Sequence, residues 1–187
     1  PVALVAATPV GVVTLDAIDP ATGDSVIRWY TADGDRRWSE PLEDLPADVR
    51  EEIVYDRDDG YELGYSTDLV AFGDGALLTS GSGVVVLDEA GLQRVRQCWS
   101  GLVLPESYVC EDVETSVTEG VDPNGAVLWT VEDVTLRTGL YERAPALLYA
   151  DYSSPGRTYG LVDPATGRVG EALNLGEDYV QLVGTPE

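Results

Sequence analysis

One turn-forming motif recurs along the whole chain. The hexapeptide Asp-Pro-Ala-Thr-Gly-Asp at 19–24 returns at 163–168 with only its last residue changed, to Arg. Shorter versions that begin with Asp and end with Gly lie near 56–61, 88–92 and 122–126. Their glycines, at positions 23, 60, 91, 125 and 167, are spaced 37, 31, 34 and 42 residues apart. Internal similarity at a period of roughly 20–50 residues is typical of solenoids, propellers and arrays, which stack copies of one small unit.

Short runs rich in β-branched residues flank these turns. They cover 12–15, 26–30, 84–87, 92–95, 126–131 and 159–162, with further runs at 69–72, 76–79 and 146–149. Proline presets φ, aspartate accepts a hydrogen bond from the backbone that follows it, and glycine adopts a positive φ without steric cost, so the motif suits tight returns between strands. Helical periodicity is almost absent. Residues 48–54 form one brief helix or a loop, and the sequence predicts an all-β protein.

The length and contents of the repeat favour a β-propeller. A unit of about 36 residues with four short strands matches one propeller blade, whose sheet buries both faces against its neighbours. We therefore predict a single β-propeller domain over residues 1–187 with about five visible blades. Residues 2–9 and 180–186 are near copies. This similarity favours a larger ring of six to eight blades, of which the five are a part, over a five-bladed ring that closes with the two ends adjacent.

The turns also resemble those of a known family. The Asp-x-x-Thr-Gly turns at 19–23 and 163–167, each followed by a strand, resemble the repeat of PQQ-like (quinoprotein-type) β-propellers. Trp129, four residues after Gly125, lies where that family often places its docking tryptophan, whereas Trp29, six residues after Gly23, departs from the pattern. The resemblance implies the propeller fold. It suggests a quinone cofactor only as an alternative, because no cofactor-binding set is identifiable in the repeats, and no cofactor is expected.

Charge and composition exclude several classes of function. The chain has 34 Asp and Glu against 11 basic residues, a formal net charge of −23, and no histidine. Such a surface repels phosphate backbones and anionic lipid head groups, so we expect no nucleic-acid partner. Without histidine, Ser-His-Asp and Cys-His nucleophile systems cannot form. The sequence has no apolar run of the roughly 18 residues that a membrane span needs. It begins at Pro1 rather than Met, for which a signal peptide or lipid anchor upstream of Pro1 is one explanation and a trimmed chain the other.

Two cysteines bear on the compartment. Cys98 and Cys110 enclose a loop whose flanks read as strand ends, and a hairpin-like return there could bring the two sulfurs together. A single cysteine pair outside a C-x-x-C motif is more typical of an exported protein than of a redox or metal site. The sequence therefore predicts a disulfide and an extracytoplasmic location, secreted or anchored at the cell surface. Two unrelated thiols in a cytosolic protein are the alternative.

Candidate catalytic and metal-binding residues are few. The stretch Asp-Arg-Asp-Asp-Gly at 56–60 resembles a calcium loop, but it lacks the full alternation of carboxylates and a bidentate glutamate at the twelfth position. A solvated turn explains it equally well. A glycosidase needs two carboxylates roughly 5–9.5 Å apart, and the sequence singles out no such pair. We assign no catalytic, cofactor-binding or metal-binding residue.

These observations favour a non-enzymatic, exported β-propeller that binds another protein or acts as a scaffold in a larger, membrane-anchored assembly. One alternative is a carboxylate-based enzyme on a propeller, either a glycoside hydrolase or a quinoprotein-like dehydrogenase. The other is a propeller that binds its ligand through calcium.

Overall fold

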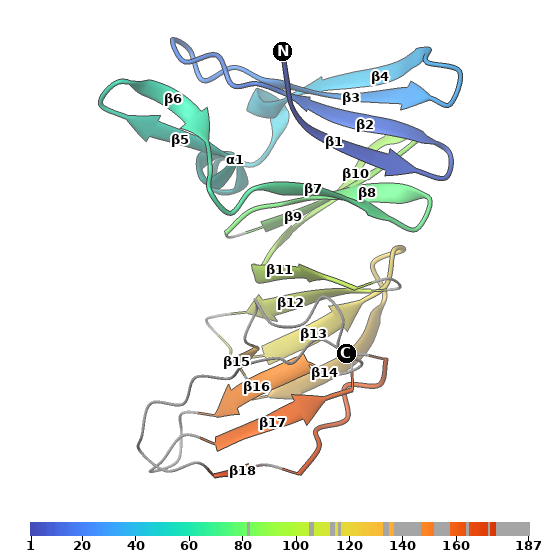
Figure 1. Ribbon diagram of the computed structural model, residues 1–187, viewed down its shortest axis with the longest axis vertical. Helices are drawn as coiled ribbons and strands as arrows, with labels where there is room; N and C mark the ends of the chain where they lie inside the picture. The colour runs from blue at the N-terminus through green and yellow to red at the C-terminus, as the bar shows by residue number, and fades with distance from the viewer. Residues whose placement is uncertain are drawn as a thin grey trace, which may run out of the picture. The chain divides into compact units, whose positions relative to one another are not determined.

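A computed structural model describes residues 1–81, 83–104, 107–112, 115, 117–132, 135–136, 147–151, 158–163, 165–171 and 173–174. Antiparallel strands dominate, and the described residues contain one α-helix and one 3-10 helix (Figure 1). None of these helices is long and apolar enough to cross a membrane. The chain divides into two compact units, residues 1–106 and 107–187.

Two four-stranded sheets form the frame of the first unit. In both, neighbouring strands follow each other in sequence and pair antiparallel, so each sheet is an up-and-down meander. The first sheet contains β1 (Val2–Thr8), β2 (Gly11–Asp16), β3 (Val26–Thr31) and β4 (Arg36–Pro41). The second contains β7 (Asp68–Phe72), β8 (Gly75–Thr79), β9 (Gly83–Asp88) and β10 (Gly91–Gln97). This topology is that of propeller blades.

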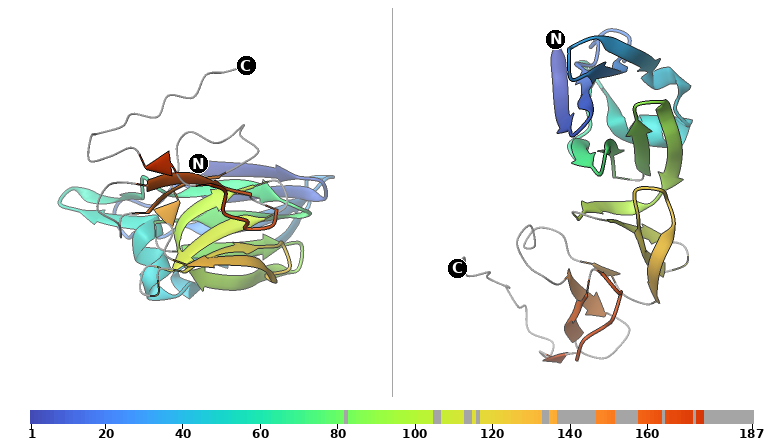
Figure 2. Two further views of the ribbon diagram at one scale, coloured as in Figure 1. Left: turned by 90° about the horizontal axis from the view of Figure 1, so that it is seen from below. Right: turned by 90° about the vertical axis from the view of Figure 1, so that its right-hand side faces the viewer.

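The segment that connects these two sheets forms a structure of its own. It begins with the 3-10 helix η1 (Leu42–Asp44) and the helix α1 (Ala47–Ile53), and it ends with a hairpin of β5 (Val54–Arg57) and β6 (Gly60–Leu63). The brief helix expected at 48–54 is therefore present. The left view of Figure 2 shows this segment (cyan to teal) to one side of the sheets.

Two further four-stranded sheets complete the described fold. Their strands again follow the order of the sequence. The third sheet contains β11 (Trp99–Val103), β12 (Tyr108–Asp112), β13 (Val117–Val121) and β14 (Val127–Glu132), and the fourth contains β15 (Thr135–Leu136), β16 (Leu147–Asp151), β17 (Thr158–Val162) and β18 (Leu173–Asn174). The prediction of an all-β propeller fold is confirmed. Of the five expected repeats, four are four-stranded sheets and one, near 56–61, is the two-stranded hairpin. Residues 180–186 lie outside the described residues.

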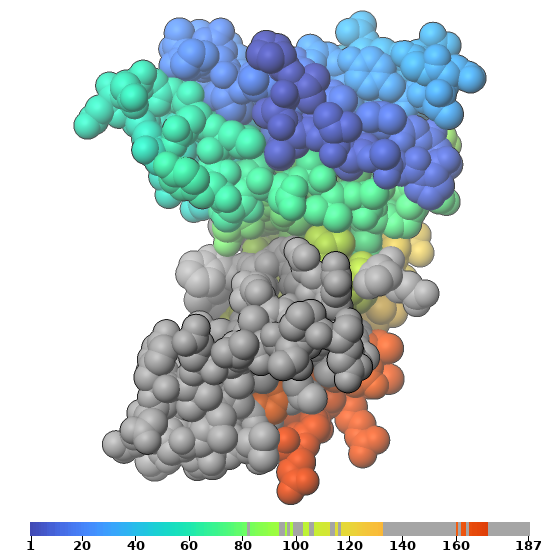
Figure 3. Space-filling view, in the orientation of Figure 1, coloured from blue at the N-terminus to red at the C-terminus, as the bar shows by residue number. Residues whose placement is uncertain are grey.

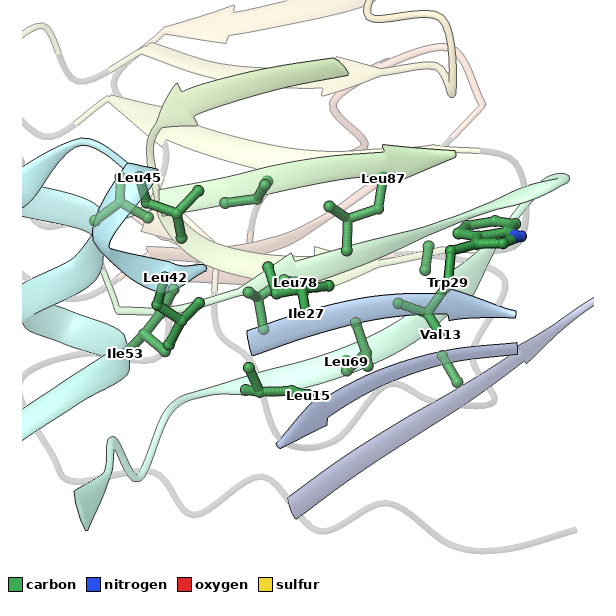
Figure 4. Packing of buried hydrophobic residues seen from close by; sticks show 14 residues of the cluster. Val13, Leu15, Ile27, Trp29, Leu42, Leu45, Ile53, Leu69, Leu78 and Leu87 are labelled. Carbon is green, nitrogen blue, oxygen red and sulfur yellow. The ribbon is translucent and has the colours of Figure 1, made fainter. Parts of the chain in front are cut away.

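The core of the first unit lies between its two sheets. Figure 4 shows side chains of the first sheet, such as Leu15 and Ile27, packed against Leu78 and Leu87 of the second. All four are fully buried, and burial of a side chain of this size contributes roughly 1.5–3 kcal/mol. The connecting segment adds Leu42, Leu45, Val49 and Ile53 to the same cluster. The two sheets and the segment between them therefore share one core.

The recurring turns have the chemistry predicted for them. Asp19 accepts a side-chain hydrogen bond from the backbone N–H of Ala21 at 2.8 Å, and Asp163 accepts the equivalent bond from Ala165 at 2.9 Å. Asp88 and Asp122 make similar bonds to the backbone that follows them. All five glycines have positive φ: 77° at 23, 129° at 60, 132° at 91, 80° at 125 and 68° at 167.

The five turns do not, however, occupy equivalent corners. The turns at Gly91, Gly125 and Gly167 join the third and fourth strands of their sheets, as a repeated blade requires. The turn at Gly23 joins the second and third strands of the first sheet, and Gly60 closes the separate hairpin. The Asp-to-Gly turns occur at different connections because their hydrogen bonds and positive φ are local, and such a turn can join any two adjacent antiparallel strands.

Tryptophans of outer strands contact the turn of the following sheet. In the first unit, Nε1 of Trp38 in β4 donates a 2.9 Å hydrogen bond to the carbonyl oxygen of Asp88. In the second unit, Trp129 of β14 is 6% exposed and packs against Gly120 and Gly167. A methyl group on Gly167 would lie 2.7 Å from Cβ of Trp129. Both tryptophans thus reach the connection between the third and fourth strands of the following sheet.

Both cysteines are disulfide-bonded and buried. Cys98 directly precedes β11, and Cys110 lies in β12. The structure therefore contains the disulfide that the sequence predicts.

Candidate functional site

The hairpin of β5 and β6 presents one face to solvent. Its register pairs Tyr55 with Glu62 and Asp56 with Tyr61. Because successive side chains of a strand point to opposite faces, Tyr55, Arg57 and Glu62 share one face and Tyr61 lies on the other. Figure 3 shows the hairpin (teal) on the surface of the first unit.

Two tyrosines stand out on the exposed side. Tyr55 is 44% exposed, and Tyr65, in the turn that follows β6, is 81% exposed. Arg57 interacts with Tyr65, and it shares a face of the hairpin with Tyr55. We call the surface formed by Tyr55, Arg57, Glu62 and Tyr65 the hairpin face.

Arg57 makes three interactions within the hairpin face. Its Nε lies 2.5 Å from Oε1 of Glu62. Its Nη2 donates a hydrogen bond to the hydroxyl oxygen of Tyr65. Its guanidinium carbon lies 5.1 Å from the centroid of the Tyr65 ring, which is the geometry of a cation–π interaction. The guanidinium therefore makes an ion pair, a hydrogen bond and an aromatic contact at the same time.

The opposite side of the hairpin is braced against the first sheet. The backbone N–H of Tyr61 donates a 3.0 Å hydrogen bond to the carbonyl oxygen of Pro20. A methyl group on Gly23 would lie 3.1 Å from the Tyr61 ring, so the ring sits directly on the turn at 19–24. The hairpin is therefore attached to the scaffold rather than free to swing about its two connections.

The turn that carries Tyr65 is tight and close to α1. Gly64 N–H donates to the carbonyl oxygen of Ile53 at 2.8 Å, and Thr67 N–H donates to that of Gly64 at 3.0 Å. Any side chain at Gly64 would collide with the backbone of Glu52. Only glycine permits this approach, and the turn points the Tyr65 ring into solvent.

The surroundings of the hairpin face are strongly acidic. Residues 42–68 contain ten carboxylates and two arginines. An open, shallow depression in the surface is lined by Asp56, Arg57, Asp58 and Asp59. At an ionic strength near 0.15 M, screening confines this negative potential to about 8 Å around the segment. A positively charged ligand is therefore attracted to the hairpin locally.

The residues considered as a calcium loop, 56–60, form the end of this hairpin. In the part of the chain that the structure describes, no three Asp, Glu or Cys side chains gather closely enough to hold a metal ion. No sequence pattern described above predicts the hairpin face. The signal that could have found it is the alternation of Tyr55 and Arg57 before the Asp-Asp-Gly turn, with Tyr65 five residues after Gly60.

Comparison with known proteins gives structural similarities only. No family model matches the sequence, and no curated protein matches it. A protein of unknown function from Bacteroides caccae is 14% identical, with a TM-score of 0.33, over 93% of this chain and 61% of that one. The Neurospora crassa Pan2 WD40 domain is 10% identical, with a TM-score of 0.42, over 93% of this chain and 50% of that one. A complex of KlAtg21 with the coiled coil of AgAtg16 matches with 8% identity and a TM-score of 0.45, over 92% and 55%.

The chain thus spans between half and about three fifths of the length of these structures. With identities of 8–14% and TM-scores of 0.33–0.45, they transfer no function to it. The assignment as an all-β protein of propeller-type sheets rests on the order and pairing of its own strands.

Proposed function

We propose that this chain is a non-enzymatic β-propeller module that binds another protein, and that the hairpin face is its contact surface. Tyrosine and arginine are, with tryptophan, the residue types enriched at the energetic centres of protein interfaces, because they combine large contact area with polar tips. The hairpin face brings two tyrosines and one arginine together on a braced support.

The observation that carries this proposal is the exposure of Tyr65. Its side chain is 81% exposed, while its backbone is held by the hydrogen bonds of the Gly64–Thr67 turn. A large aromatic side chain on an ordered turn loses little conformational entropy when a partner covers it. Exposed tyrosine on a fixed backbone is therefore well suited to association.

The proposal includes a location outside the cytoplasm. A buried disulfide between Cys98 and Cys110 supports an oxidising compartment, because cytosolic proteins seldom keep such bonds. The module would be secreted or held at the cell surface as part of a larger, membrane-anchored assembly. Thiol alkylation of the protein isolated from its native source tests this part, since a fully alkylated, reduced pair would contradict it.

We also propose kinship with the PQQ-like propellers. The support is the contact of Trp129 with Gly167, which lies in one of the two Asp-x-x-Thr-Gly turns. The contact matches the role that the resemblance gives to this tryptophan. The relationship is tested by a search for PQQ-like propellers that align with this chain. Such a sequence should carry Trp at the position of Trp129 and Gly at the position of Gly167.

The binding proposal is tested by comparing baits in a native extract. The wild-type chain should recover a defined protein, identified by mass spectrometry, that a Tyr55→Ala/Tyr65→Ala bait recovers at less than a tenth of the amount. Binding of that purified protein to each variant, measured by calorimetry, should reproduce the difference.

The matched control bait is Val127→Ala/Leu128→Ala. These two side chains of β14 are 47% and 50% exposed, so the control truncates two exposed apolar side chains that are not part of the hairpin face. It should recover the same protein as the wild type. Equal recovery by all three baits would overturn the hairpin face as the contact surface.

A further inference from the structure

The hairpin face already holds a cation, and that cation belongs to the chain itself. The guanidinium of Arg57 is placed between the carboxylate of Glu62 and the ring and hydroxyl of Tyr65. A carboxylate beside an aromatic ring is a combination that binds arginine and lysine side chains, through charge-assisted hydrogen bonds and the negative face of the ring. We call the pair of Glu62 and Tyr65 the cation seat.

We propose that the cation seat receives an arginine or lysine side chain from a basic segment of a partner protein, and that this side chain takes the place of Arg57. The inference rests on the proposed function and adds the chemical class of the partner. It makes Arg57 an internal placeholder, which occupies the seat while the partner is absent.

The charge around the seat favours a basic segment over other ligands. Asp56, Asp58 and Asp59 surround the same end of the hairpin, and all three are exposed. Among the described residues, none of these three carboxylates forms a salt bridge. A segment with several positive charges can therefore place one in the cation seat and others beside the turn carboxylates, whereas an anionic or neutral segment gains neither contact.

Exchange of Arg57 is feasible because both paired side chains are partly exposed to water, even though Oε1 of Glu62 itself is covered. The side chains of Arg57 and Glu62 are 40% and 42% exposed, and solvent-exposed ion pairs contribute little net stability. The cation–π contact to an exposed ring is also weak. Arg57 can therefore leave the seat and remain solvated, while the incoming cation brings the rest of its segment into contact with the hairpin face.

The test is a titration of the full chain with the peptide Gly-Arg-Gly-Arg-Gly-Arg-Gly, followed by NMR of the isotopically labelled protein at an ionic strength of about 0.15 M. The largest shift changes should fall on residues 55–65. The same peptide with glutamate in place of arginine should cause none. Shift changes spread evenly over all acidic segments of the chain would overturn the proposal.

Variants of the seat give the decisive result. Tyr65→Leu and Glu62→Gln should each weaken peptide binding about two- to fivefold. Arg57→Ala should strengthen it by a similar factor, because the seat is then vacant. A purely structural role of Arg57 in the hairpin predicts the opposite sign, and weaker binding by Arg57→Ala would overturn the proposal.

Arg37→Ala is the matched control for charge. Arg37, in β4, forms a 3.1 Å ion pair with Glu89, and both side chains are about half exposed. Its removal changes the net charge of the chain by the same amount but leaves the seat intact. If Arg37→Ala strengthens peptide binding as much as Arg57→Ala does, the affinity depends only on the net charge of the chain, and this result would exclude the cation seat.

These outcomes separate the inference from the proposed function. Hairpin-dependent recovery of a partner whose contact segment has no arginine or lysine would keep the protein-binding function and overturn the cation seat. Binding of the arginine peptide at the seat, together with equal recovery of proteins by all baits, would support the affinity of the seat for a basic segment and overturn the hairpin face as the contact surface for the recovered proteins.

Discussion

The indole Nε1 of Trp38 donates a 2.9 Å hydrogen bond to the carbonyl oxygen of Asp88, 50 residues further along the chain. Trp38 lies in the outer strand of the first sheet, and Asp88 begins the turn between the last two strands of the second. The adjacent Arg37 forms an exposed ion pair with Glu89 of the same turn. One partly buried hydrogen bond and one exposed ion pair therefore connect the same two elements.

Substitution of Trp38 by Phe should lower the free energy of unfolding by about 1 kcal/mol, because the hydrogen bond to Asp88 is lost while most of the aromatic packing is kept. Arg37→Ala should cost less, within about 0–1 kcal/mol and near the lower end, since its ion pair is solvated. Urea denaturation followed by circular dichroism measures both. A larger loss for Arg37→Ala than for Trp38→Phe would contradict this ranking.

Two glycines of the first unit allow a matched test of the hairpin brace. Gly23 and Gly34 have similar positive φ values, 77° and 88°. A methyl group on Gly34 would meet no atom within 4 Å, whereas one on Gly23 would lie 3.1 Å from the Tyr61 ring. Gly34→Ala should cost about 1 kcal/mol for the left-handed conformation alone, and Gly23→Ala roughly 1 kcal/mol more for overpacking. Equal costs would mean that Tyr61 does not rest on this turn.

Much of the fold is predictable because its determinants are local. The β-branched runs at 12–15 and 26–30 became β2 and β3, and the run at 84–87 became most of β9. The Asp-to-Gly turn chemistry was also correct, since the aspartate bonds and positive φ values form within a few residues of each other. The positions of the turns within the sheets were not predictable. The same five residues, Asp-Pro-Ala-Thr-Gly, lie in a connection between second and third strands at 19–23 and between third and fourth strands at 163–167.

The candidate site depends on a contact that the local sequence does not contain. Alternation places Tyr55 and Tyr61 on opposite faces of the hairpin, but it does not say which face is covered. The turn at 19–24 determines which face is covered, because it packs on Tyr61, although the two are separated by about 40 residues in the sequence. The exposure of Tyr55, Arg57 and Tyr65 follows from this long-range contact, so sequence patterns alone gave no site.

Reduction of the disulfide should destabilise the protein. The bond between Cys98 and Cys110 encloses 11 residues, and closure of a loop of this size contributes roughly 3 kcal/mol in the chain-entropy model. Urea denaturation with and without a phosphine reductant should show this loss. The Cys98→Ser/Cys110→Ser variant cannot form the bond, so its stability should match that of the reduced wild type whether or not the reductant is present. An unchanged wild-type midpoint, with reduction confirmed by thiol titration, would contradict the prediction.

The turn at 163–168 predicts a response to acid. The carboxylate of Asp163 accepts a 2.9 Å hydrogen bond from the backbone N–H of Ala165 and a second bond from the hydroxyl of Thr166, and these bonds hold the pKa of Asp163 below its ordinary value. Because the folded pKa is the lower one, the stabilisation is complete above the unfolded pKa of about 3.9. It is lost as the pH falls through the folded pKa.

Carbon-detected NMR of the Asp163 carboxyl group, titrated from about pH 6 towards pH 2, measures this pKa directly. Its midpoint should lie below that of the isolated peptide 161–170 under the same conditions. Asp163→Asn keeps an oxygen acceptor for the Ala165 N–H but cannot titrate, so the stability of the wild type relative to this variant should fall in the acid range. A midpoint at or above that of the peptide would show that the turn does not favour the charged carboxylate.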